Sequence, residues 1–190
     1  MEQPILKRRG NYRDLLCYRK AEAIYDITYF FVNKFLQKSN RTIDQMIQAA
    51  RSGKQNIIEG YAASATSIET ELRLFNVAKS SLKELLADYE DYLRTRDLRR
   101  WSEDSIEFKK AQELGKEHDD SEFWMEIVQT RNDETIANLA IILLYQTDYL
   151  IYKFANGVGK RFEEEGGFRE KLSKIRKNAI KKKMTTKNRP

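Results

Sequence analysis

The sequence is poor in the residues that most catalytic and metal sites need. Its 190 residues include one His and one Cys. A structural zinc site usually takes four Cys or His ligands, and a helical di-iron site takes two Glu-x-x-His pairs, so this composition fits neither. No Gly-rich phosphate loop occurs, and nothing local supports Cys17 and His118 as a nucleophile–base pair. We expect no metal, no cofactor and no enzymatic activity.

Turn-forming residues are also scarce. The chain has eight Gly and two Pro, and both prolines, Pro4 and Pro190, are terminal. Neither Gly nor Pro occurs between Tyr61 and Leu114. A sheet protein of this length needs many turn residues, so the sequence predicts an all-α fold.

Long apolar runs are missing too. The most apolar stretch, 136–151, is interrupted by Gln146, Thr147 and Asp148, which predicts no membrane span. The first ten residues are polar and basic, unlike a secretory signal. A single Cys cannot close an internal disulfide, which favours a reducing compartment. Together these features predict a cytoplasmic protein.

Hydrophobic periodicity predicts four long helices that pack as a bundle, at about residues 12–36, 42–63, 67–96 and 132–155. In the third, eight positions from Ile68 to Leu93 keep a 4-3 alternation, and all of them except Lys79 are apolar, which is typical of a bundle seam. Asn156 and Gly157 are expected to end the fourth helix. Gly53, inside the second, predicts a close approach by a neighbouring helix. Cys17 lies on the apolar face of the first, where a buried core residue is expected.

Two segments exceed a minimal bundle. Residues 97–131 link the third and fourth helices, and are expected to form short helices at about 102–116 and 121–129. The pattern from about Gly166 to Pro190 predicts a basic amphipathic helix followed by a disordered terminus. We therefore divide the chain into a bundle, 1–160, and a basic suffix segment, 161–190.

Particular residues carry a family resemblance. They are Tyr12-Arg13-Asp14-Leu15, Arg19-Lys20-Ala21, Arg51, Asn56-Ile57-Ile58-Glu59-Gly60, Glu71, Phe75 and Ala78-Lys79-Ser80-Ser81-Leu82-Lys83-Glu84-Leu85. With them the chain resembles the four-helix-bundle family named after the 23S ribosomal RNA intervening-sequence proteins, which includes the accessory variability determinant of diversity-generating retroelements. The segment Glu165-Gly166-Gly167-Phe168-Arg169-Glu170 resembles the suffix domain of one branch. Pro near Lys54 and Gly near Ser80, frequent in the family, are absent here.

The resemblance implies an up-down-up-down bundle that assembles into a barrel-like homopentamer without catalytic residues. It also implies possible partners, because the retroelement members bind nucleic acid and act with a reverse transcriptase. Asn56, Glu59 and Gly60 form the family's structural motif in this chain. Asn56 and Glu59 share a helix face, where we expect a hydrogen bond across the bundle and an ion pair with a neighbouring helix.

Charge is unevenly distributed along the chain. Residues 169–190 hold ten Lys or Arg and one Glu, a net charge of +9. The preceding 168 residues hold 25 Lys or Arg and 28 Asp or Glu, a net charge of −3. Lys and Arg clusters bind phosphates without reading sequence, which predicts RNA or DNA binding. The predicted contacts are Arg169, Lys171, Lys174, Arg176, Lys177, Lys181, Lys182 and Lys183, aided by Arg51 and Lys54.

Two other interpretations stay open. The chain could be a protein–protein scaffold, for example for a reverse transcriptase, with Trp101, Phe123 and Trp124 as the partner contact. The same rings could instead simply cap the bundle. The basic tail from about Gly166 to Pro190 could also attach to a membrane surface, although Phe168 is the only aromatic residue on its apolar face.

Overall fold

The computed structural model describes residues 10–37, 41–165, 173, 176, 177 and 180. Those ranges hold a short 3-10 turn and six α-helices and no β-strand, which confirms the all-α prediction. The elements are η1 (Tyr12–Asp14), α1 (Leu16–Phe35), α2 (Thr42–Ala63), α3 (Ile68–Thr95), α4 (Ile106–Glu117), α5 (Ser121–Val128) and α6 (Asp133–Glu165).

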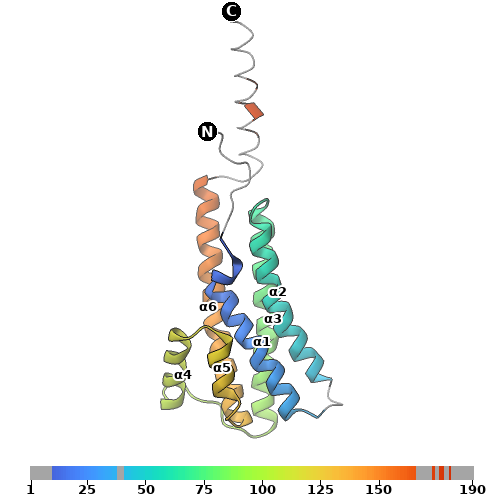
Figure 1. Cartoon of the computed structure of the whole chain (residues 1–190), viewed down its shortest axis with the longest axis vertical. Helices are drawn as coiled ribbons and strands as arrows, with labels where there is room; N and C mark the ends of the chain where they lie inside the picture. Colours follow the sequence, from blue (N-terminus) through green and yellow to red (C-terminus); the bar gives the residue numbers. More distant parts are fainter. Residues whose placement is uncertain (1–9, 38–40, 166–172, 174–175, 178–179, 181–190) are drawn as a thin grey trace, which may run out of the picture.

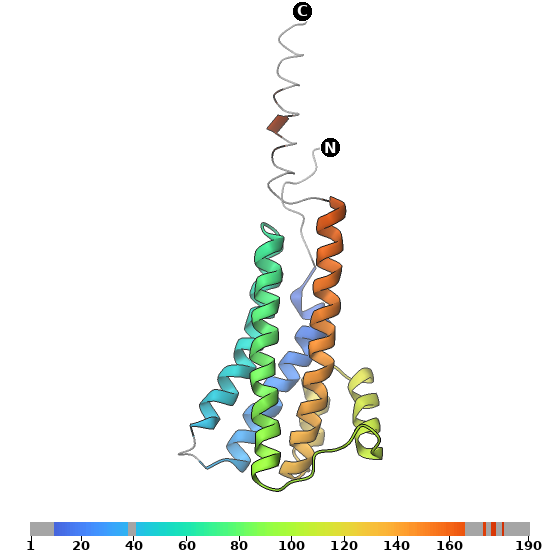
Figure 2. The ribbon, with the colours of Figure 1, turned by 180° about the vertical axis from the view of Figure 1, so that it is seen from behind.

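The four long helices lie side by side (Figure 1). α1 packs against α2 and α6, and α3 packs against the same two helices. The short helices lie outside this group, with α5 on α1 and α4 on α6 (Figure 2). All four long helices therefore contribute apolar side chains to one core, which includes Ile24, Ile57, Leu85 and Leu143.

A polar link joins α1 and α3 inside the core. The hydroxyl of Tyr89, fully buried on α3, donates a hydrogen bond to Thr28 Oγ1 at 3.0 Å. Thr28 in turn donates to the carbonyl oxygen of Ile24 at 2.7 Å. Burial of a hydroxyl is tolerated when it is hydrogen-bonded, so this chain of bonds fixes the two helices without an unsatisfied group.

Local sequence explains where several helices begin and end. The side chains of Ser67, Ser105 and Asp120 accept hydrogen bonds from backbone N–H groups in the first turns of α3, α4 and α5. α3 ends where Asp97 adopts a left-handed conformation, with φ of 55°, and Leu98 N–H bonds to Leu93 O at 3.0 Å. This is the bond pattern of a Schellman motif, with Asp in the place that Gly usually takes.

The predicted end of the last helix at residue 155 is wrong. α6 continues for ten further residues, through Asn156 and Gly157, to Glu165. Glycine in a helix interior costs only about 1 kcal/mol against alanine, so it does not by itself stop a helix. Val158 is buried in this extension, which favours its helical conformation. The proposed boundary at residue 160 accordingly falls inside α6.

The first short helix of the segment 97–131 begins later than predicted. α4 starts at Ile106, where Ser105 caps it, whereas residue 102 was expected. α5 runs Ser121–Val128, within one residue of the prediction. Of the predicted basic helix at the end of the chain, Ser173, Arg176, Lys177 and Ile180 are described, and all four are helical and exposed.

Candidate nucleic-acid interface

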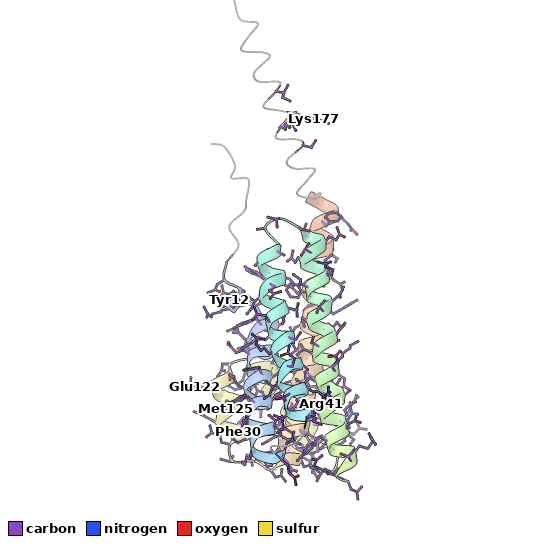
Figure 3. All side chains as sticks on the ribbon, turned by 90° about the vertical axis from the view of Figure 1, so that its right-hand side faces the viewer. Tyr12, Phe30, Arg41, Glu122, Met125 and Lys177 are labelled. Carbon is purple, nitrogen blue, oxygen red and sulfur yellow. The ribbon has the colours of Figure 1, made fainter. Side chains whose placement is uncertain are left out.

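Two of the predicted phosphate contacts near the end of the chain can be placed. Arg176 and Lys177 are exposed, and Figure 3 shows Lys177 beyond the end of α6, away from the packed helices. Their charges are therefore accessible to a polyanion. The other predicted contacts in this segment lie outside the described residues: Arg169, Lys171, Lys174, Lys181, Lys182 and Lys183.

Of the predicted pair on α2, Lys54 contacts an aromatic side chain of α1 and Arg51 is exposed. Lys54 Nζ lies 4.2 Å from the centroid of the Tyr25 ring on α1. Tyr25 stacks on Tyr29, with ring centroids 6.5 Å apart. Arg51 is exposed one turn before Lys54. A cation over a tyrosine face is held by the ring quadrupole, so Lys54 covers α1 while Arg51 points to solvent.

A row of exposed tyrosines on α6 is the feature that sequence reasoning missed. Tyr145, Tyr149 and Tyr152, which we call the tyrosine face, are each about half exposed. Each has a cationic neighbour. Lys153 Nζ lies 5.9 Å from the Tyr149 ring centroid, and Lys79 Nζ lies 5.6 Å from that of Tyr152. Arg100 Nη2 donates to the Tyr145 hydroxyl at 2.9 Å. Their spacing of four and three residues was the available signal.

A hollow lined by residues of α2 and α3 has more acidic than basic side chains. This hollow of about 620 Å³ is lined by Asp44, Glu84 and Asp88, with Arg41 at its edge. Burial raises the pKa of Asp88, and the neighbouring Asp91 and Glu84 raise it further. These carboxylates would repel phosphates, so a polyanion is better placed elsewhere on the surface.

The structural motif residues pack α2 against α3. Asn56 Nδ2 donates to Ser52 O at 2.9 Å and to Ser52 Oγ at 3.2 Å, both on α2, so the hydrogen bond predicted across the bundle is not formed by Asn56 within the described residues. The hydroxyl oxygens of Ser52 and Ser81, which lie 2.9 Å apart, link the two helices instead. A Cβ added at Gly60 would lie 2.9 Å from Phe75 Cδ2 on α3. The motif therefore permits a close approach of the two helices.

Glu59, the third motif residue, is exposed. Its Oε1 accepts a hydrogen bond of 3.5 Å from Gln55 Nε2 on the same helix. The ion pair predicted with a neighbouring helix is not formed within the part of the chain that the structure describes.

The three predicted partner-contact rings differ in accessibility. Trp124 is fully buried, and its indole N–H donates to His118 O at 3.3 Å. Phe123 is half-buried and stacks on the His118 ring, with centroids 3.6 Å apart. Trp101 is half-buried as well. The side chain of Trp124 thus offers no surface to a partner in this conformation, whereas contact by Trp101 and Phe123 stays a prediction.

Two polar side chains hold the segment 97–131 against the long helices. Asn138 on α6 accepts from Trp101 N–H at 2.8 Å and donates to Arg99 O at 2.9 Å. Lys20 on α1 is buried and donates to Gly115 O and His118 O at the end of α4. Burial lowers the pKa of Lys20, and the nearby Asp119 carboxylate opposes that effect. The ammonium group supplies a donor to the Gly115 carbonyl in the last turn of α4, and it joins the Trp124 indole N–H as a second donor to His118 O.

Cys17 is buried, and the two Asp residues that follow His118 are engaged in an ion pair and a helix cap. Burial raises the pKa of the Cys17 thiol to about 12, so it is protonated at neutral pH and a poor nucleophile. Asp119 pairs with Arg19 at 2.9 Å, and Asp120 caps α5. Among the residues that the structure describes, no three His, Cys, Asp or Glu side chains are grouped as metal ligands would be.

No protein-family model, curated protein or solved structure matches the chain. The resemblance to the intervening-sequence family therefore stays a prediction. Of the helices in the described ranges, none combines the length and the apolar character that crossing a membrane requires.

Proposed function

We propose that this chain is a non-enzymatic, homo-oligomeric helical-bundle protein that binds nucleic acid or serves as an adaptor for a nucleic-acid-processing protein. The proposed architecture is an up-down-up-down four-helix bundle of α1, α2, α3 and α6, with α4 and α5 as a helical insertion. The ring of contacts from α1 through α2, α3 and α6 back to α1 supports it. The family resemblance supports a homopentamer as the assembly.

The observation that carries the proposal is the separation of charge. The last 22 residues have a net charge of +9, and the described cations among them, Arg176 and Lys177, are exposed. Clustered cations bind phosphates by releasing counterions. In a homo-oligomer several such segments would act on one strand, and the raised effective concentration would strengthen a weak contact.

A salt titration tests this role of the basic segment. We expect the plot of log K against log salt concentration for RNA or DNA to become shallower, by about two units, when Lys181, Lys182 and Lys183 are all replaced by Gln, since each lost phosphate contact removes about 0.7 to 0.9. The matched control replaces three exposed lysines of α4 by Gln: Lys109, Lys110 and Lys116. Equal slopes for the two variants would contradict the assignment to the basic segment.

A protein–protein scaffold is the second candidate, and a hollow on the insertion favours it. Met125 on α5 and Phe30, Tyr29 and Lys34 on α1 line an apolar hollow of about 500 Å³. Figure 3 shows Phe30 and Met125 close together where α5 lies on α1. Such a surface suits an apolar side chain of a partner protein.

Met125→Glu discriminates the scaffold from the nucleic-acid binder. If the scaffold interpretation holds, this change abolishes capture of a reverse transcriptase or other partner that co-purifies with the wild type, and leaves nucleic-acid affinity unchanged. Ile106→Glu, at an exposed apolar residue on α4, is the control and should keep the partner. Loss of capture in both variants, or in neither, would argue against this hollow as the contact.

A further inference from the structure

The tyrosine face exposes more aromatic surface than its surroundings require. The side chains of Tyr145, Tyr149 and Tyr152 are 46%, 59% and 54% exposed. Residues four and three apart share one side of a helix, so the three rings form a row along α6. The Cα atoms of successive tyrosines are separated along the helix axis by about 6 and about 4.5 Å. Single exposed rings need no explanation, but three on one side of one helix indicate an interaction site.

The charges around this row favour an anionic occupant. Asp148 pairs with Lys79 at 3.4 Å and Glu90 pairs with Arg100 at 2.8 Å, so the two carboxylates are already neutralised. Lys153 forms no ion pair with any described residue, and lies over Tyr149. Lys160, exposed two turns after Lys153, continues the same side of α6. Glu163, exposed one turn after Lys160 on the same side of α6, offsets one of these two lysine charges, so the face keeps a small net positive charge beside its exposed rings.

We propose that the tyrosine face is a stacking platform for unpaired nucleobases, so that the protein takes single-stranded RNA or DNA in preference to a duplex; this inference rests on the proposed nucleic-acid binding. Every base presents a π-face, and stacking on an aromatic side chain is independent of sequence. In a duplex these faces are covered by neighbouring base pairs. Lys153 and Lys160 would contact the phosphates of the same strand.

Other occupants fit the face less well. A second copy that presented the same face would bring like charges together, which costs free energy. Lys79 and Arg100 beside the rings have carboxylate partners, whereas a purely apolar partner would leave Lys153, which has none among the described residues, without a counter-charge. A flexible single strand supplies both ring faces and negative charge at short intervals.

The experiment compares Tyr149→Leu, which keeps apolar area but removes the ring, with Tyr149→Phe, which keeps the ring. Binding is measured by fluorescence anisotropy on oligo-dT of about 20 nucleotides and on a duplex of the same length. A single strand of this length can cover several stacking positions. We expect Tyr149→Leu to weaken oligo-dT binding roughly tenfold, and to leave duplex binding and the salt slope unchanged. Tyr149→Phe should bind oligo-dT like the wild type.

Controls separate the possible failures. Phe162→Leu removes an exposed ring from another side of α6 and should leave oligo-dT binding unchanged. If wild type binds neither oligonucleotide, the proposed function fails. If wild type binds but Tyr149→Leu and Phe162→Leu act alike, the stacking proposal is overturned and the proposed function stands. A lower molar mass for Tyr149→Leu by light scattering would overturn it as well, by making the face a contact between copies.

Discussion

Replacing Trp124 by Ala is expected to lower the free energy of unfolding by about 3 to 5 kcal/mol, the usual cost of removing a buried Trp. The ring is fully buried on α5, and it packs edge-on against Phe123 with centroids 5.4 Å apart. Its N–H also satisfies His118 O, which the change leaves without that donor. α5 has only eight residues and packs on α1, and its buried residues are Trp124 and Val128, so loss of the larger side chain removes a large part of the buried surface of α5.

Urea denaturation followed by far-UV circular dichroism measures this effect without relying on Trp fluorescence. Trp101→Ala is the matched control, because the indole ring of Trp101 is only half-buried. We expect this variant to lose about 1 kcal/mol of the free energy of unfolding. A loss below about 1 kcal/mol for Trp124→Ala would show that α5 does not depend on this ring. The size of the expected loss also matters for function. If a partner no longer binds Trp124→Ala, the loss is explained first by displacement of α5 and not by removal of a direct contact with Trp124.

Much of the fold could be predicted because long periodic helices carry a strong local signal. The predicted limits of α2 agree with the structure, and those of α3 agree to within one residue at each end. The last helix shows the limit of such reasoning. Asn156 and Gly157 permit a left-handed end, but nothing in the sequence states whether the chain takes it. Packing decides, since Val158 becomes buried when the helix continues.

The candidate site was harder to predict because it depends on contacts between helices. Lys54 could be selected for its charge, but its position over Tyr25 depends on how α1 crosses α2. Burial of Trp124 likewise depends on the docking of α5 against α1. The tyrosine face differs, since its spacing is visible in the sequence. The sequence did not identify this face because tyrosine occurs both in protein cores and on surfaces. Only the exposure of the side chains in the structure distinguishes the two cases.

Replacing Gly53 by Val is expected to destabilise the protein by about 3 kcal/mol through overpacking. A Cβ at this position would lie 2.5 Å from Leu82 Cδ2 and 2.7 Å from Leu82 Cγ. Leu82 is itself buried in the core, so it has little room to move away. Gly157→Val is the matched control on α6. A Cβ there meets no atom within 4 Å, so we expect a change within about 0.5 kcal/mol of zero.

A double-mutant cycle separates the steric cause from a backbone effect. Leu82→Ala alone should cost about 2 to 5 kcal/mol because it leaves a cavity. If the methyl groups that Gly53→Val adds fill that cavity, the double variant is more stable than the sum of the two losses predicts, by at least about 1 kcal/mol. Additive losses would mean that Gly53 is needed for its backbone and not for the approach of α3. Because the same approach continues at Gly60 and Phe75, a positive result would identify the α2–α3 contact as the reason for both glycines.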